Sequence, residues 1–166
     1  MTGALGMEAE EVSEMLLERT AQAILNDDFE GFSHCFAIPH KIDTPDRKVT
    51  LETRDALRTL FQGVVQDYKN RNVTALIRHC EVAEFRGPQK VEATHVSHVM
   101  SGHQRVVDPF HTYSVMQFTD NRWQISATQY TLDRQIPVGA TLHAMTDFET
   151  GPASPPANTE TSKKET

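Results

Sequence analysis

The chain has 166 residues, a formal net charge of −7 and a hydrophobic content of 38%. This length predicts one domain with a sizeable core, and the acidic balance argues against nucleic acid or an anionic membrane as partner. No apolar run approaches the roughly 20 residues of a membrane span. Cys35 and Cys80 are far apart and form no C-x-x-C pair, so we expect reduced, buried thiols. Without a basic and apolar leader, the sequence predicts a cytoplasmic protein.

The first half of the chain carries the spacing of three helices. Apolar residues recur every three or four positions over residues 9–26. Residues 26–28 end this helix and supply an aspartate that can cap a short, phenylalanine-rich second helix. A small hairpin is expected over residues 38–51, after which Thr53 can cap a third helix. The apolar stripe of that helix ends at Tyr68, whose hydroxyl needs a polar partner or a cavity.

The second half, Val73 to Arg134, reads as four long strands joined by tight turns. Helices followed by such a meander indicate an α+β domain in which a strongly curved, mainly antiparallel sheet wraps around the helices. A sheet of this shape can leave a cavity on its concave face.

Strand parity predicts which side chains face that cavity. A tight turn at Asp120-Asn121 pairs Phe118 with Trp123, and counting by twos from this pair assigns the two faces of the sheet. On the expected concave face, the polar side chains and two neighbours on their strand, Cys80 and Val82, point inward. The polar ones are Arg78, His95, Ser97, Asp108, Thr112 and Gln129. The expected convex face includes His111, Tyr113 and Tyr130. A register slip at the turns near Gly87-Pro88 or Ser101–Gln104 would exchange the faces.

The inward polar residues allow two interpretations. In the first, Arg78 pairs with Asp108, His95 joins them, and the group is a satisfied structural network, because a buried charge is costly without a partner. In the second, they are the few placed polar groups of a small-molecule pocket, in which Asp108 beside His95 serves proton transfer.

No motif points to a metal or a cofactor. His95 and His98 are three residues apart on a strand, which directs their rings to opposite faces. The sequence has no H-E-x-x-H, no G-x-S-x-G and no glycine-rich phosphate loop. We therefore expect no metal site and no bound cofactor.

The element order, the acidic-aromatic segment 27–32 and the Trp123-x-Ile125 pattern on the last strand resemble the nuclear-transport-factor-2-like superfamily. This superfamily includes SnoaL-like cyclases, ketosteroid isomerases and scytalone dehydratase, and the chain is most similar to its uncharacterised bacterial members. The resemblance covers roughly residues 8–134 and implies a cystatin-like cone, with three N-terminal helices packed on the sheet and a pocket inside. It also implies a homodimer that packs through the sheets. We assign residues 1–148 to this domain and 149–166, rich in Pro, Ser and Thr, to a flexible tail.

Two functions remain open. One is an uncharacterised small-molecule-binding protein with an apolar pocket inside the cone. The other is a small cofactor-free enzyme of the isomerase, dehydratase or cyclase type, which uses a pocket Asp or His. The predicted lining is Tyr68, His95, Asp108 and Gln129, with Arg78 near Asp108 and His40 at the mouth. The predicted homodimer interface is the convex face, including His111, Tyr113 and Tyr130.

Overall fold

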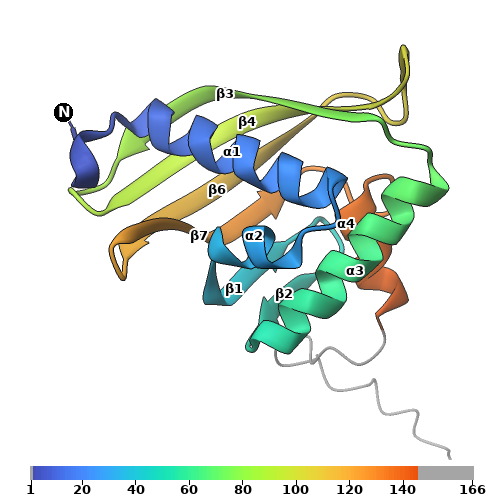
Figure 1. Cartoon of the computed structure of the whole chain (residues 1–166), viewed down its shortest axis with the longest axis horizontal. Helices are drawn as coiled ribbons and strands as arrows, with labels where there is room; N and C mark the ends of the chain where they lie inside the picture. The colour runs from blue at the N-terminus through green and yellow to red at the C-terminus, as the bar shows by residue number, and fades with distance from the viewer. Residues whose placement is uncertain (1, 146–166) are drawn as a thin grey trace, which may run out of the picture.

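Three helices lie on the concave side of a strongly curved sheet in the computed structural model, which describes residues 2–145 (Figure 1). A fourth helix lies beside the third, at one end of the sheet. The helices are α1 (Ala9–Leu25), α2 (Phe29–His34), α3 (Arg54–Asn70) and α4 (Pro137–Ala144), after a single turn, η1 (Ala4–Gly6). The strands are β1 (Phe36–Asp43), β2 (Lys48–Leu51), β3 (Ala75–Phe85), β4 (Lys90–Ser101), β5 (Gln104–Arg105), β6 (Phe110–Thr119) and β7 (Arg122–Tyr130).

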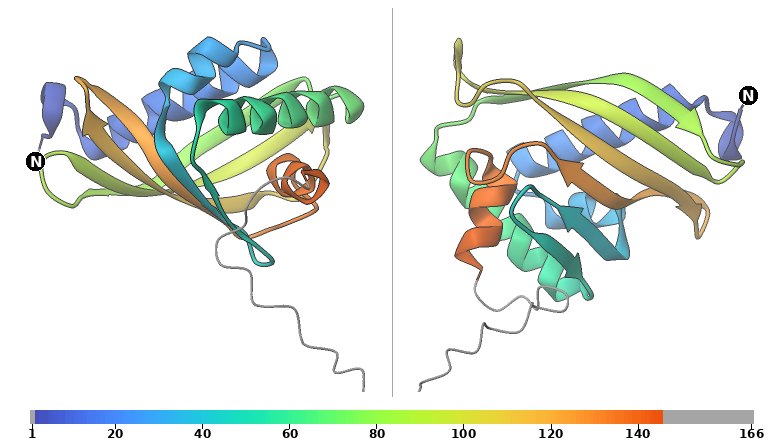
Figure 2. Two further views of the ribbon diagram at one scale, coloured as in Figure 1. Left: turned by 90° about the horizontal axis from the view of Figure 1, so that it is seen from below. Right: turned by 180° about the vertical axis from the view of Figure 1, so that it is seen from behind.

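The seven strands form one sheet in the order β2-β1-β7-β6-β4-β3, with β5 added beside β4. Every pairing is antiparallel except that of β1 with β7, which is parallel. The two ends of this order do not pair over the described residues, so the cone is an open, bent sheet and not a closed barrel. Figure 2 shows the sheet curving around the helices. The predicted α+β class and cystatin-like cone are confirmed.

The helices begin where their capping residues predict. The Asp28 carboxylate accepts a hydrogen bond from the Gly31 amide at 3.0 Å, and the Thr53 hydroxyl accepts one from the Ala56 amide at 3.1 Å. At the start of α1, the Glu8 amide donates to the Glu11 carboxylate at 2.8 Å. These bonds satisfy amides that the first helical turn leaves without a partner.

The last hairpin fixes the register of the sheet. Asp120 and Asn121 both have positive φ, 54° and 60°, as a two-residue hairpin turn requires. Phe118 pairs with Trp123, as predicted, and both contact the core on the helix side of the sheet. Trp123 is buried, with 2% of its surface exposed.

A β-bulge in β7 reverses the predicted parity beyond Ile125. Met116 pairs with Ile125, but Val115 pairs with Ala127, so Ser126 is an extra residue on β7. Gln129 is therefore exposed on the outer face, and its predicted place in the pocket is wrong. The prediction for Tyr130 is also wrong, because its side chain faces inward and not toward the convex surface.

A second bulge lies in β3, where Cys80 pairs with His95 and Val82 pairs with Thr94. Arg78 and Cys80 face inward as predicted. Val82, beyond the bulge, faces outward and is 53% exposed, which corrects its predicted orientation.

Asp108 lies outside the sheet. The prediction placed it on the concave face of a strand, but β6 begins at Phe110, which pairs with Ser97 of β4. Asp108 is an exposed residue of the loop before β6. The predicted Arg78–Asp108 pair is therefore wrong.

The helix α4 had no counterpart in the sequence-based prediction. Its Leu142 is 1% exposed and packs with Leu60, Phe61 and Val64 of α3 in the main core. The predicted tail, 149–166, and the last residues of the predicted domain lie outside the described residues. Within residues 2–145, no helix is long and apolar enough to cross a membrane.

Candidate functional site

A cavity of about 90 Å³ lies inside the cone, between the helices and the concave face of the sheet. Its wall is mostly apolar and includes side chains of α1, α2, α3 and the strands β1, β3, β4, β6 and β7. Its polar side chains come from several elements and are Thr20, His40, Tyr68, Arg78, His95, Ser97, Thr112, Ser114, Thr128 and Tyr130. The structure thus brings four predicted site residues to one cavity, His40, Tyr68, Arg78 and His95, and leaves Asp108 and Gln129 outside it.

Arg78 is the one charged side chain in this lining. Its Nη2 donates to the carbonyl oxygen of Leu17 and to the hydroxyl of Thr20, each at 2.5 Å, which fixes the guanidinium against α1. Its Nε is buried and has no hydrogen-bond partner in the described part of the chain. Burial lowers the pKa of Arg78, while the nearby phenols of Tyr68 and Tyr130 act in the opposite direction. The guanidinium is therefore held rigidly and is only partly satisfied.

His40 is fully buried, with 1% of its surface exposed, so the prediction that it lies at the mouth is wrong. Its Nε2 lies 3.4 Å from the Thr128 hydroxyl, and its Nδ1 is buried without a partner in residues 2–145. Burial lowers the pKa of His40 to about 4, so the imidazole is neutral at physiological pH.

His95 projects from the middle of β4 and is 6% exposed. Burial lowers its pKa to about 3, and the positive charge of Arg78 adds to this effect. His95 is therefore a neutral imidazole beside a fixed cation, and not the protonated member of an Asp–His pair.

Two phenols, of the buried Tyr68 and the partly buried Tyr130, add to the polar lining of the cavity. Burial raises the pKa of Tyr68 to about 12 and also raises the pKa of Tyr130, although the charge of Arg78 opposes both shifts. Both hydroxyls therefore stay protonated and can donate hydrogen bonds. The sequence analysis missed Tyr130 because the β7 bulge was not anticipated.

The lining contains no carboxylate. One guanidinium, two phenols and two neutral imidazoles supply mainly hydrogen-bond donors and a positive charge. This arrangement suits a ligand group that accepts hydrogen bonds, and it lacks the Asp–His pair that the proton-transfer hypothesis required.

Comparisons with known proteins identify the fold. No family model matches the chain, and no curated protein matches it. A cystatin-like domain of unknown function from Nostoc punctiforme is 18% identical, with a TM-score of 0.59 over 75% of this chain and 78% of that one. An NTF-2-like protein of unknown function from Shewanella oneidensis is 9% identical, with a TM-score of 0.56 over 72% and 95%. A protein from Novosphingobium aromaticivorans, provisionally named a scytalone dehydratase, is 12% identical, with a TM-score of 0.54 over 72% and 80%.

The chain has the nuclear-transport-factor-2-like fold. At these identities the likeness extends to the fold alone, and the residues inside the cone must be interpreted from their own geometry.

In this nuclear-transport-factor-2-like fold, the α4 segment closes one end of the cone. Ile136, Pro137 and Val138 line the cavity. Arg71 donates to the carbonyl oxygen of Gln135 at 2.8 Å, and Arg47 donates to that of Leu142 at 2.6 Å. The cavity is therefore covered by a helix that charged side chains hold in place.

A polar cluster ties the same helix to the β1–β2 hairpin. The carboxylate of Asp133 accepts hydrogen bonds from the Thr44 hydroxyl, the His143 ring and the Asp46 amide, the last at 3.3 Å. Asp46, Asp133 and His143 bring three potential metal-ligand atoms within 4.8 Å of one another. Because both oxygens of Asp133 already accept protein hydrogen bonds, we interpret this cluster as a structural tie.

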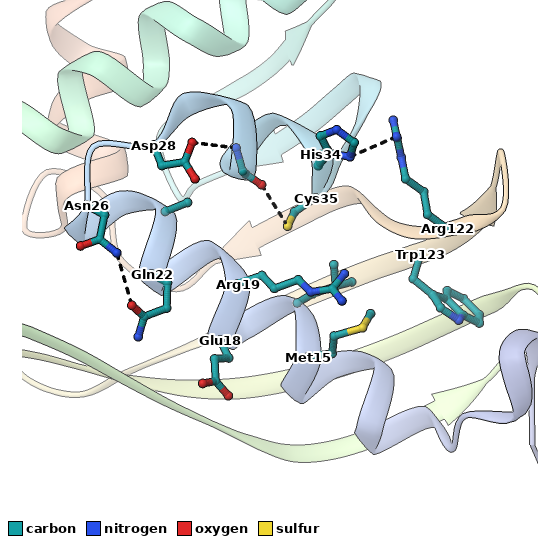
Figure 3. Close-up of a pocket in the computed structure, with 13 residues that line it drawn as sticks. Met15, Glu18, Arg19, Gln22, Asn26, Asp28, His34, Cys35, Arg122 and Trp123 are labelled. Carbon is teal, nitrogen blue, oxygen red and sulfur yellow. Dashed lines mark hydrogen bonds between the residues drawn. The ribbon is translucent and has the colours of Figure 1, made fainter.

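A wider hollow of about 800 Å³ lies outside the cone, between α1, the end of α2 and the start of β7 (Figure 3). Arg122 donates to the His34 ring at 3.2 Å across one side of it, and Arg19 lies on the α1 side. Cys35 is buried at its base, where burial raises the pKa of the thiol. Because its charged side chains lie on the surface, this hollow is a weaker candidate than the enclosed cavity.

Proposed function

We propose that this protein binds a small molecule in the cavity inside the cone. One observation carries the proposal. Three buried polar atoms without a hydrogen-bond partner in residues 2–145 belong to residues that line this one cavity: His40 Nδ1, Arg78 Nε and Thr112 Oγ1. Leaving such a group unsatisfied costs about 1–3 kcal/mol, so a cluster of them favours a ligand that completes their hydrogen bonds.

The remainder of the lining supports an apolar ligand body. Phe32, Leu60, Val64, Phe110 and Ile125 contribute aromatic and aliphatic wall to the cavity. A mostly apolar wall with a few converging polar groups is typical of small-molecule sites. The volume of about 90 Å³ is below the range of about 300–1,000 Å³ for larger ligands, which favours a small one.

The alternative is a cofactor-free enzyme, an isomerase, dehydratase or cyclase, that transfers protons in the same cavity. It loses one of its two candidate groups, because Asp108 is exposed outside the cavity. His95 remains as a candidate base, but a pKa of about 3 makes it a weak base at neutral pH. Binding without chemistry is therefore the better supported function.

A thermal-shift screen against a library of small metabolites tests the proposal. The screen uses the wild-type protein, His95→Ala and His98→Ala, because His98 lies on the same strand with its side chain on the other face. We expect one ligand class to raise the melting temperature of the wild type and of His98→Ala but not of His95→Ala. Equal stabilisation of all three proteins, or stabilisation of none, would contradict binding in the cone.

A further inference from the structure

Resting on the proposed function, we infer that the ligand is a small monocarboxylate whose carboxylate lies against the Arg78 guanidinium and the Tyr68 and Tyr130 hydroxyls. The apolar part of the ligand would then occupy the remaining wall of the cone. The inference follows from the charge, the donor geometry and the size of the cavity.

The charge inside the cone is unbalanced. No carboxylate of residues 2–145 forms a salt bridge with Arg78, and Asp108, the predicted partner, is exposed in a loop. Glu14 attracts Arg78 without a salt bridge to it, and its carboxylate accepts a hydrogen bond from the Cys80 amide at 2.8 Å. A buried cation normally has a hydrogen-bonded anion beside it. An anionic ligand would supply that partner.

The donors at this end are held in place before any ligand arrives. The two bonds from Nη2 of Arg78 to Leu17 and Thr20 fix the plane of the guanidinium and leave Nε without a partner. The N–H of Nε is thus a fixed, charged donor for one carboxylate oxygen, and charge-assisted hydrogen bonds of this kind are the strong ones. Tyr68 and Tyr130 line the same cavity as Arg78, and their protonated hydroxyls can each donate a hydrogen bond to a ligand oxygen.

The net charge and the volume restrict the ligand further. One guanidinium balances one negative charge, so the second charge of a phosphate dianion would remain uncompensated among apolar residues. The neutral imidazoles of His40 and His95 do not add positive charge. The cavity of about 90 Å³ then restricts the apolar part to a short aliphatic chain or a single ring.

Isothermal titration calorimetry with matched ligand pairs tests the inference. Acetate, butyrate, hexanoate and benzoate are titrated at pH 7.5, each beside its uncharged primary amide and beside inorganic phosphate. We expect at least one carboxylate to bind at least 10-fold more tightly than its amide, and phosphate not to bind. Removing one member of a buried charge pair is costly, so Arg78→Met should weaken carboxylate binding at least about 30-fold. Arg78→Lys should give an intermediate loss, because it keeps the charge but not the fixed N–H of Nε.

Arg105→Met is the matched control, since Arg105 is an exposed arginine of β5, and it should bind carboxylates like the wild type. Circular dichroism establishes that each variant is folded before binding is compared. Carboxylates that bind no better than their amides would overturn the inference, and so would full binding by folded Arg78→Met. If uncharged library compounds still stabilise the wild type but not His95→Ala, the proposed function stands without the carboxylate. If no compound of either kind binds, both fail.

Discussion

The α-carbon of Gly139 lies directly against the backbone of Asp133: a Cβ at Gly139 would stand 1.9 Å from the Asp133 carbonyl oxygen. The same carbonyl accepts a hydrogen bond from the Ile136 amide at 3.1 Å, which closes the turn before α4. The helix that covers the cone can therefore approach this turn only because residue 139 has no side chain.

Gly139→Ala should therefore destabilise the protein by about 1–3 kcal/mol, because the methyl group meets backbone that cannot rotate away. Chemical denaturation measures the change in the free energy of unfolding. Ala144→Ser, at the exposed end of the same helix, should change it by less than about 0.5 kcal/mol. Equal stability of Gly139→Ala and the wild type would show that α4 does not need this contact.

Acid should weaken the tie between α4 and the β1–β2 hairpin. Burial acts to raise the pKa of Asp133, but the hydrogen bonds from Thr44 and His143 outweigh it and hold the pKa below the ordinary value of 3.8. A depressed carboxylate pKa contributes stability above 3.8 that is lost as the pH falls through the lower, folded-state value. Asp133→Asn should thus cost about 1.5–3 kcal/mol at neutral pH and lose less stability than the wild type below pH 4. Asp108→Asn, in an exposed loop, should behave like the wild type in the same titration.

The two cavity histidines should give a separate pH dependence. Burial lowers the pKa of His40 to about 4 and that of His95 to about 3, from an ordinary value of 6.5. Below pH 6.5 the unfolded chain binds more protons, so stability is full above this pH and falls as the pH decreases toward 4. Each histidine contributes a slope of up to about 1.4 kcal/mol per pH unit.

Urea denaturation between pH 4 and 7 measures this slope. His95→Gln and His40→Gln should each flatten it, whereas His98→Gln, on the outer face of β4, should leave it unchanged. A wild-type slope that neither cavity variant reduces would be evidence against buried, neutral imidazoles.

Removing the charge of Arg78 should not destabilise the ligand-free protein. The carbonyl oxygen of Leu17 that accepts from Arg78 lies inside helix α1, so it can keep its helical hydrogen bond without Arg78. The cation itself has no carboxylate partner in the described residues. An enclosed charge without an ion-pair partner is itself costly, so an apolar side chain of similar size removes that cost. We expect Arg78→Met to unfold at the same or a higher urea concentration than the wild type. A loss above about 2 kcal/mol would mean that Arg78 is a structural residue.

The outer face of the sheet should form a homodimer interface. Val82 and Tyr113, which are 53% and 36% exposed, both pair with Thr94 of β4, and Gln129 pairs with Tyr113. With Thr94 they form a row across four strands. The His111 ring lies near this row beside the Glu81 carboxylate, with Nε2 and Oε2 3.1 Å apart. An uncharged row that includes an exposed valine and an exposed tyrosine favours association of two sheets.

Light scattering at micromolar concentration should therefore give the mass of a dimer. The double variant Val82→Lys with Tyr113→Lys should be monomeric, because it introduces like charges at a self-complementary interface. Leu5→Lys removes an exposed apolar residue outside the sheet and should leave the dimer intact. A monomeric wild type would exclude this interface.

The sequence predicted those elements that local chemistry determines. Capping by Asp28 and Thr53, and the tight turn at Asp120-Asn121, depend on neighbouring residues and were located correctly. The inward direction of His95 followed from simple alternation, because β4 carries no extra residue. Arg78 faces inward as predicted because a one-residue error in the register at the Gly87-Pro88 turn was offset by the bulge at Glu81.

The remaining errors have non-local causes. A bulge adds one residue opposite its partner strand, and neither Ser126 nor Glu81 differs chemically from its neighbours in a way that announces it. Each bulge reversed every later side chain on its strand, which misplaced Gln129 and Tyr130. Asp108 was assigned to a strand because the loop before β6 was underestimated by two residues. The α4 segment has no clear apolar stripe, so only its packing against α3 reveals it.

The one parallel pairing in the sheet also bears on how the chain reaches its native state. The meander from β3 to β7 forms from segments that are neighbours in the chain, whereas β1 joins the distant β7. The side-chain amide of Gln124 in β7 donates to the carbonyl oxygen of Phe36 in β1 at 3.1 Å, across a separation of 88 residues. Closing so long a loop carries an entropic cost before any contact is gained, so sheets with distant partners fold slowly. The β2–β1 end of the sheet would then assemble after the meander. Substitutions in β1 would mainly accelerate unfolding, whereas those in the β6–β7 hairpin would slow folding.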